Sequence, residues 1–192
     1  MGSGKNGTFD KVPDWQQWAL LIVQKDTQEN NIEKPAFGAF INNWYKLFGC
    51  ELYSIFLHPI EGHGTWDGKE VFGQLPRQSV YDGQIAVLTR ATIRINKLNF
   101  FWKNVAPVAS KMQTFPGFIL SFGIGEIPWI KQATFSVWSS KEAMKAFAYG
   151  TKEHAEVIQK TRKQEWYSEN MFTRFKIINT TGSLRGKNPL KS

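Results

Sequence analysis

The side chains that could do chemistry in this chain are few, and the first of them is one histidine in the last third of the sequence. His154 continues a helical pattern of apolar residues that begins at Met144 and Phe147 and extends to Ile158. A neutral imidazole at such a place can ligate a metal, accept a proton, or form an ordinary hydrogen bond at the edge of a core. From the residues alone, the structural role is the simpler interpretation.

The other histidines and the single cysteine offer less. His58 and His63 lie beside proline or glycine, and neither has a metal-ligating partner four residues away. Cys50 is the only cysteine, which rules out an intramolecular disulfide and a thiolate cluster. Without a Ser-His-Asp order, a Cys-His pair or a close pair of carboxylates, hydrolysis has no positive support.

Three arginines could hold an anionic group. Arg90 and Arg94 are expected on one face of a strand at 84–95, and Arg162 follows His154 by about two helical turns. A guanidinium binds carboxylates in a bidentate manner, so these side chains could bind the carboxylates of a ligand. A solvated or salt-bridged arginine is the equal alternative for each.

The chain is also rich in flat rings, with 15% aromatic residues, eight of them tryptophan. Such rings can line a cavity for a porphyrin or a polyene, although aromatic residues also dominate ordinary cores. The candidates for a substrate pocket are Trp138, Phe147, Tyr149 and Trp166. Core packing is the simpler explanation for each of them.

The second half of the sequence must position these residues, and its pattern predicts an α+β fold. In order, we expect a strand at 84–95, a helix at 98–112 that Pro107 bends or ends, strands at 118–123 and 133–138, a helix capped by Ser139 or Ser140 and interrupted at Gly150, and a strand at 171–178. This is the βαββαβ order of a ferredoxin-like unit.

The first half predicts a shorter version of the same unit. A buried strand is expected at 18–24, an amphipathic helix at 37–48 and a strand at 51–57, followed by a Gly- and Pro-rich loop at 62–78. We therefore divide the chain into a partial N-terminal α+β repeat at 1–78 and a C-terminal ferredoxin-like domain at 79–192, which carries the candidate site.

An internal repeat supports this division. Residues 64–72 (GTWDGKEVF) and 182–190 (GSLRGKNPL) share the pattern G-[ST]-x-x-G-K-x-x-apolar. The first copy has only strand, helix and strand, and half a ferredoxin-like sheet leaves exposed edges. We expect the N-terminal segment to pair with the C-terminal unit or with another subunit.

The net charge of +8 raises the question of an anionic partner. Lys and Arg are scattered singly, and no nucleic-acid-binding signature accompanies them, so nucleic acid is not expected. Basic surfaces are attracted to anionic lipid. With neither a signal peptide nor an apolar run of ~18 residues, we expect a cytoplasmic protein with peripheral membrane contact at most.

Several segments together resemble spheroidene monooxygenase. They are GIGE at 123–126, ATFSVW at 133–138, the 143–149 helix, WYSENMFTRF at 166–175 and LTRATIR at 88–94, with His154 and Arg162 in matching order. The resemblance spans nearly the whole chain. It implies a haem protein of the dimeric α+β-barrel type that oxygenates a carotenoid, with a helical histidine as the proximal haem ligand.

With the resemblance included, we predict a haem-dependent monooxygenase acting on a carotenoid or a similar long apolar substrate. His154 would be the catalytic and axial ligand of haem b iron, and Arg90, Arg94 and Arg162 would hold its propionates. We expect a homo-oligomer with an external electron donor. The alternatives are a cofactor-free monooxygenase of the antibiotic-biosynthesis type, acting on a small aromatic polyketide or quinol, and a non-catalytic module that binds haem or lipid.

Overall fold

A computed structural model describes residues 1–4, 9–24, 38–150 and 152–190, with the backbone alone described at 106, 152–156 and 162. The elements follow in the order β1 (Gly2–Ser3), β2 (Pro13–Asp14), α1 (Ala39–Leu47), β3 (Tyr53–Gly64), β4 (Ile85–Ile93), the short 3-10 helix η3 (Ile95–Lys97), α2 (Leu98–Gln113), β5 (Phe118–Ile127), β6 (Lys131–Trp138), α3 (Lys141–Gly150), α4 (Lys152–Lys163) and β7 (Tyr167–Gly182).

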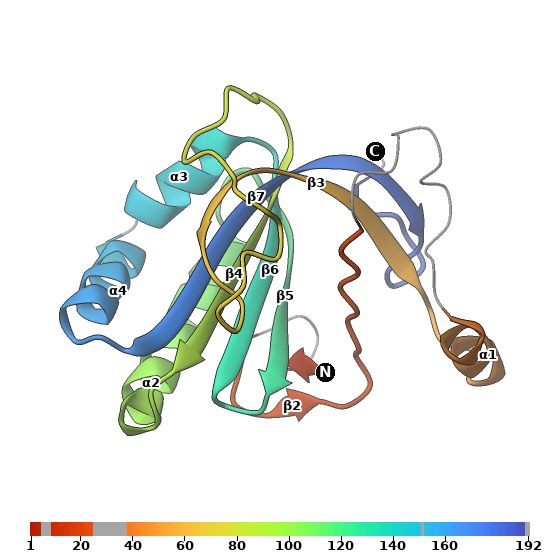
Figure 1. Cartoon of the computed structure of the whole chain (residues 1–192), viewed down its shortest axis with the longest axis horizontal. Coiled ribbons are helices and arrows are strands. Elements are labelled where there is room, and N and C mark those ends of the chain that lie inside the picture. Colours follow the sequence, from red (N-terminus) through yellow and green to blue (C-terminus); the bar gives the residue numbers. More distant parts are fainter. Residues whose placement is uncertain (5–8, 25–37, 151, 191–192) are drawn as a thin grey trace.

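The second half forms the predicted ferredoxin-like unit. Its four strands β4, β5, β6 and β7 stand in the order β5-β6-β4-β7, and all neighbouring pairs are antiparallel. Helix α2 joins β4 to β5, and α3 with α4 joins β6 to β7 (Figure 1). The predicted α+β class and βαββαβ order are thereby confirmed.

Local sequence signals set most of these boundaries. The Ser140 hydroxyl accepts a hydrogen bond from the Ala143 N–H at 3.1 Å, as the predicted N-cap requires. The helical pattern is divided at Gly150, where α3 ends. Pro107 lies inside α2 and does not end it. The closing strand is longer than predicted, because β7 runs from Tyr167 to Gly182 rather than over 171–178.

Helices α2, α3 and α4 lie on one side of the sheet (Figure 1), and both faces of the sheet carry an apolar layer. On the side of the helices, β4 residues such as Ile85 and Ile93 pack against α2 and α3 side chains, including Met112 and Phe147. On the other side, Ala86 and Leu88 of β4 belong to a separate cluster. That second layer is covered by the segment after β3 and by the end of the chain, through Trp66, Val71, Phe72 and Leu190.

The N-terminal segment pairs with the C-terminal unit, as predicted. β1 pairs with β5, and β3 pairs along most of its length with β7, so both extend one seven-stranded sheet of order β2-β1-β5-β6-β4-β7-β3. The strand predicted at 51–57 continues through His58 and Pro59 to Gly64. Proline is tolerated there because β3 is an edge strand, where one backbone N–H is not needed.

The strand predicted at 18–24 was wrong. These residues have no regular secondary structure, and the Trp18 side chain is 74% exposed, with Leu20 at 57%. Apolar and β-branched residues show that a segment requires burial, but they do not say which strand it pairs with. Here β1 and β2 occupy the edge beside β5, and residues 18–24 lie outside the sheet.

The internal repeat is visible as two matching turns. After β3, Trp66 and Lys69 form a bridge, and after β7, Leu184 and Lys187 do the same. The turn residues Asp67 and Arg185 have nearly equal positive φ angles, 51° and 55°. The carboxylate of Glu169 accepts hydrogen bonds from backbone N–H groups of the first turn. The carboxylate of Glu51 accepts hydrogen bonds from backbone N–H groups of the second turn.

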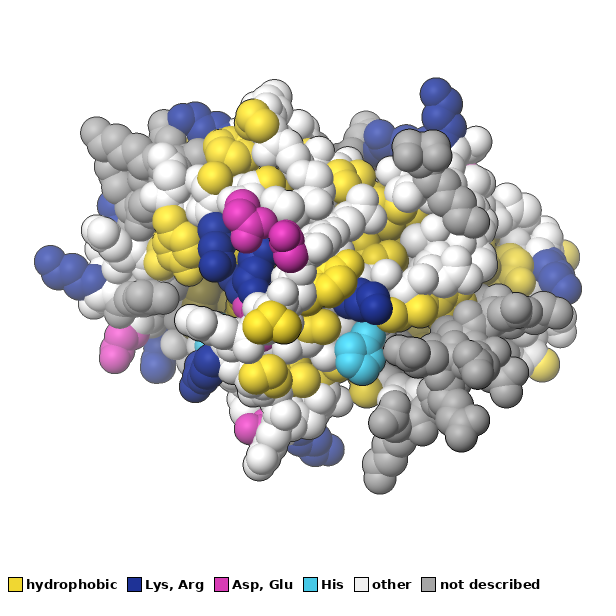
Figure 2. All heavy atoms as spheres, turned by 90° about the horizontal axis from the view of Figure 1, so that it is seen from above, with side chains coloured by type: hydrophobic (Ala, Val, Ile, Leu, Met, Phe, Trp, Pro, Cys, Tyr) yellow, Lys and Arg dark blue, Asp and Glu magenta, His cyan; other side chains and the backbone are white. Residues whose placement is uncertain are grey.

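On the face shown in Figure 2, Lys and Arg side chains are scattered among hydrophobic ones, in agreement with the sequence-based expectation. In the described part of the chain, no helix is long and apolar enough to span a membrane.

Candidate functional site

The most elaborate polar arrangement surrounds Arg90 at the centre of the sheet. Its side chain, 1% exposed, projects from β4 on the face opposite the helices. The guanidinium contacts Asp67 at 2.8 Å, Glu126 at 2.9 Å and Glu169 at 2.7 Å. The ring of Trp66 lies over it at 4.9 Å. One cation thus ties β5, β7 and the turn after β3 to the middle of the sheet.

The charges in this cluster stabilise one another. Burial by itself would raise the pKa of Glu169, but hydrogen bonds from the Gly68 N–H, the Thr65 hydroxyl, Arg90 and the Asp67 N–H together lower that pKa to about 2. Burial opposes the charged form of Arg90 as well, yet its three carboxylate partners raise its pKa. Glu169 and Arg90 are therefore both ionised at neutral pH.

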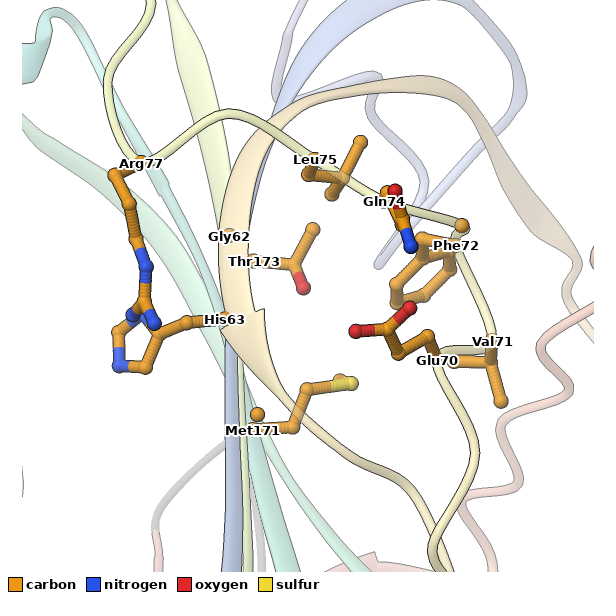
Figure 3. Close-up of a pocket in the computed structure, with 12 residues that line it drawn as sticks. Gly62, His63, Glu70, Val71, Phe72, Gln74, Leu75, Arg77, Met171 and Thr173 are labelled. Carbon is orange, nitrogen blue, oxygen red and sulfur yellow. The ribbon is translucent and has the colours of Figure 1, made fainter.

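A cavity of about 270 Å³ lies beside this cluster, between β3, β7 and the segment after β3. It is lined by Gly62, His63, Gly64, Glu70, Val71, Phe72, Gly73, Gln74, Leu75, Arg77, Met171 and Thr173. In Figure 3, Glu70, Gln74 and Thr173 point toward its centre, whereas His63 and Arg77 lie on the other side of β3. At about 270 Å³, its volume lies just below the range of roughly 300–1,000 Å³ that is common for pockets of small molecules and cofactors.

A second buried ionic cluster lies on the helix side of the sheet. Glu61 of β3, 1% exposed, is bound by Arg174 of β7 and by the Lys141 ammonium of α3 at 3.0 Å. The Ser79 N–H donates to the same carboxylate at 2.7 Å. Burial lowers the pKa of Arg174. Together with the Arg90 cluster, this arrangement fixes both ends of the segment that borders the cavity.

The predicted haem contacts are separated by the sheet. The backbone of His154 lies in α4, on the helix side, but its side chain and that of Arg162 fall outside the described residues. Arg90 projects to the opposite face and already has three carboxylate partners, so a propionate would have to displace one of them. This placement does not support a haem contact for Arg90. Arg94 is exposed and lies just beyond the end of β4.

The predicted substrate-pocket residues do not form one pocket. Trp138 and Phe147 pack against each other in a core cluster, with ring centroids 5.2 Å apart. Trp166 is buried in a different cluster, and Tyr149 is 65% exposed. For the three buried rings, the structure therefore favours core packing, the simpler of the two explanations.

The surroundings of α4 are nevertheless aromatic. Val157 of α4 packs against a buried cluster that contains Phe101, Trp102 and Trp166. Burial raises the pKa of the neighbouring Tyr167 to about 12, against an opposing hydrogen bond with Thr161, so its phenol stays protonated at neutral pH. The helix that carries His154 thus borders a layer of flat, uncharged rings.

The remaining histidines are exposed strand residues. His58 and His63 both lie in β3, and the His63 ring stacks on Phe172 at 5.6 Å. Among the residues that the structure describes, no group of three His, Cys, Asp or Glu side chains is arranged to hold a metal ion.

Sequence reasoning missed the partners of Arg90 although it singled out their segments. Glu126 ends the GIGE segment and Glu169 lies within WYSEN, but both are charged residues in strand-forming sequence and carry no signal of mutual contact. Their pairing depends on which strands are neighbours. Only the sheet order brings β4, β5 and β7 into register around one guanidinium.

Comparison with curated proteins identifies the family. A protein named spheroidene monooxygenase from Rhodobacter capsulatus is 34% identical over 194 residues, and the match covers 100% of this chain and 79% of that protein. The chain belongs to the spheroidene monooxygenase family. The family member from Cereibacter sphaeroides is 34% identical over 98% of this chain and 58% of its own length. The one from Rubrivivax gelatinosus is 32% identical over 97% of this chain and 70% of its own.

Other comparisons concern parts of the chain or its shape. A family model described as a domain of unknown function (DUF3291) matches residues 84–176, which contain most of the ferredoxin-like unit of this spheroidene monooxygenase family member. A conserved protein from Methanosarcina mazei is 12% identical with a TM-score of 0.42, over 49% of this chain and 92% of that one.

Proposed function

We propose that this protein is a monooxygenase that transfers one oxygen atom from O₂ to a carotenoid or a similar long apolar polyene. The observation that carries the proposal is the 34% identity with a spheroidene monooxygenase along the whole chain. The segments that first suggested the family are strands and helices of the C-terminal unit, so the likeness extends through its core. The chain spans 58% of the length of the relative from Cereibacter sphaeroides.

The proposal includes haem b as cofactor. A carotenoid has no acidic group that could activate O₂ without a cofactor, and a bound haem would supply that redox chemistry. The chain's own contribution would be the His154 imidazole as a ligand of the iron, carried by α4, whose Val157 packs against the aromatic layer of Phe101 and Trp166. Those rings would keep water away from an apolar substrate. Arg94 and Arg162 are the propionate partners that we retain, and a separate reductase would supply electrons.

An absorption spectrum tests the haem ligand. The purified protein, expressed with a haem supply, is expected to show a Soret band, and His154→Ala is expected to lose it or to shift it. His58→Ala and His63→Ala are matched controls, because both side chains are exposed on β3. An unchanged band in His154→Ala, or a loss confined to a control variant, would contradict the assignment.

Turnover tests the function. The protein is incubated with a carotenoid extract, O₂ and a reductant, and the pigments are separated by chromatography. We expect a new, more polar pigment that depends on O₂ and on the reductant. A Soret band without any turnover would instead support a protein that only binds haem.

Two partner proposals follow from the surface. The face of α1 that carries Phe40, Trp44 and Leu47 is exposed, with 77%, 55% and 80% of these residues accessible. An aromatic amphipathic helix on a protein of charge +8 suits the surface of an anionic bilayer, where a polyene would dissolve. We also propose a homo-oligomer, for which the following subsection gives the contact.

A further inference from the structure

Within the described part of the chain, two elements are suited to pair with a strand and have no such partner there. The first is the outer edge of β3, which ends the seven-stranded sheet. The second is the apolar segment 18–24, which belongs to no strand. An open sheet edge and an unpaired strand-forming segment each favour association.

The edge of β3 presents unpaired backbone groups. The Leu52 carbonyl accepts a hydrogen bond from the Ser183 N–H at 3.1 Å. This bond shows which residues at the start of β3 direct their backbone groups toward β7. Alternate residues of an antiparallel ladder direct their N–H and C=O groups away from the partner. Tyr53 and Ile55 therefore direct theirs outward. Among the described residues, no strand pairs with this edge.

The molecule itself shows what such an edge accepts. The internal repeat relates β3 to β7, since both end in the same turn and both turns are held by a glutamate. The edge of β7 that faces away from β3 is occupied by β4, in antiparallel register. The corresponding edge of β3 is open. A β-strand is thus the element that fits it.

Segment 18–24 has the composition of an interior strand. Trp18, Leu20 and Ile22 would face one side of a sheet, and Leu21 and Val23 the other, so both faces are apolar. In the single chain these side chains are exposed, between 43% and 74%. No backbone hydrogen bond to another described residue is recorded within 18–24.

We propose that segment 18–24 of one copy pairs with the outer edge of β3 in a second copy, and that the exchange is reciprocal. In a twofold arrangement the same contact is made twice, so the β3 edge of each copy is paired with segment 18–24 of the other copy. The position suits a strand with two apolar faces, because β3 borders both apolar layers through Leu57 and Ile60. A lipid surface would cover apolar side chains but could not pair the outward N–H and C=O groups.

Sedimentation of the full chain is the first test. We expect a dimer at micromolar concentration. Leu20→Lys or Ile22→Lys should raise the dissociation constant of this dimer at least tenfold. Both side chains are exposed in the single chain, so the fold of the monomer should be unaffected. Val80→Lys is the control, because Val80 is a fully exposed apolar residue that lies outside both segment 18–24 and β3. A monomer at high concentration, or a dimer that ignores both segment variants, would overturn the proposal.

Crosslinking tests the geometry. In a Cys50→Ser background, a protein with Ile22→Cys is mixed with one carrying Ile55→Cys, and neighbouring positions are scanned because the register is free. A disulfide is expected between the two different chains, and none when Val80→Cys replaces either partner. A double-cysteine chain that crosslinks only within itself would show pairing in the same molecule and reject the exchange. Vesicle binding that is lost in Leu20→Lys without any dimer would assign the segment to lipid instead.

Discussion

Arg90 shows how far a residue type alone can mislead. Its spacing on a predicted strand suggested an anion-binding side chain, and it does bind anions, but they are Asp67, Glu126 and Glu169 of the same chain. A buried cation needs such partners, because an unpaired charge in the interior of a protein loses its hydration without any compensating attraction. The local sequence around Arg90 does not indicate which carboxylates will be its partners.

Replacing Arg90 should therefore destabilise the fold. Arg90→Gln leaves three carboxylates facing one another, and we expect the free energy of unfolding to fall by about 2–4 kcal/mol. Urea denaturation followed by circular dichroism measures this. Arg94→Gln is the control, since Arg94 is exposed, and should change stability by less than about 0.5 kcal/mol. Equal stability of the two variants would show that the Arg90 cluster is not structural.

The Glu169 carboxylate should make stability depend on acid. Its pKa in the folded protein is about 2, below the ordinary value of 4.5, so it stabilises the fold above about pH 5. That contribution is lost as the pH falls from 5 through 2. We expect it to be about 1–2 kcal/mol, reduced by the solvent that reaches the carboxylate.

The variant Glu169→Gln checks this contribution. Its free energy of unfolding should fall less steeply than that of the unaltered protein between pH 5 and pH 2. Glu142→Gln serves as the comparison, because Glu142 lies in the first turn of α3, outside the Arg90 cluster. Parallel pH profiles for Glu169→Gln and the unaltered protein would remove the role of this carboxylate.

At the scale of elements, the two matching turns require their glycines. Gly64 and Gly182 have φ angles of +85° and +83°, and a Cβ at either would overlap a carbonyl oxygen, of Asn170 or Leu52 respectively. We expect Gly64→Ala and Gly182→Ala each to cost about 1–3 kcal/mol in thermal or urea unfolding. Gly68→Ala, with positive φ but open space around it, should cost about 1 kcal/mol. If Gly68→Ala were the most costly of the three, close backbone approach would not be the cause.

The exposed face of α1 gives a membrane prediction. Trp44→Glu should reduce sedimentation with anionic vesicles several-fold, because it removes an aromatic anchor and adds a repelled charge. Tyr149→Glu is the control, since Tyr149 is also exposed but lies at the far helix pair. Equal binding of both variants would place the lipid contact elsewhere, and no binding by any of the proteins would reject it.

The elements predicted best from sequence are those set by local chemistry. The β6 strand, the cap at Ser140 and the break at Gly150 follow from periodicity and from capping, and all three are in the structure. The failure at 18–24 has a different origin: a strand exists only where another strand is beside it, and pairing partners far apart in sequence leave no local trace.

The candidate site was predicted less well for a related reason. Aromatic residues such as Trp138 and Phe147 give the same sequence pattern whether they line a pocket or fill a core. Here they fill a core. The sheet also separates Arg90 from the helix of His154, although the sequence predicts both as contacts of one cofactor. Which face a residue occupies follows from the whole sheet.

For the whole molecule, the sheet separates the helices from the cavity. One antiparallel sheet carries three helices on one side, with a small polar-lined cavity on the other, and the sequence is that of a spheroidene monooxygenase family member. The proposed chemistry is on the helix side, where α4 meets the layer of Phe101 and Trp166. The ionic clusters hold the sheet that supports this side.

The most direct test of the oxygenase proposal is the fate of molecular oxygen. The protein is supplied with haem, a reductant, a carotenoid and ¹⁸O₂, and the product is analysed by mass spectrometry. We predict a pigment that carries ¹⁸O, with one labelled atom added in each oxygenation, and its loss in His154→Ala but not in His58→Ala. A product that carries only unlabelled oxygen, or no product from a haem-loaded protein, would contradict the account.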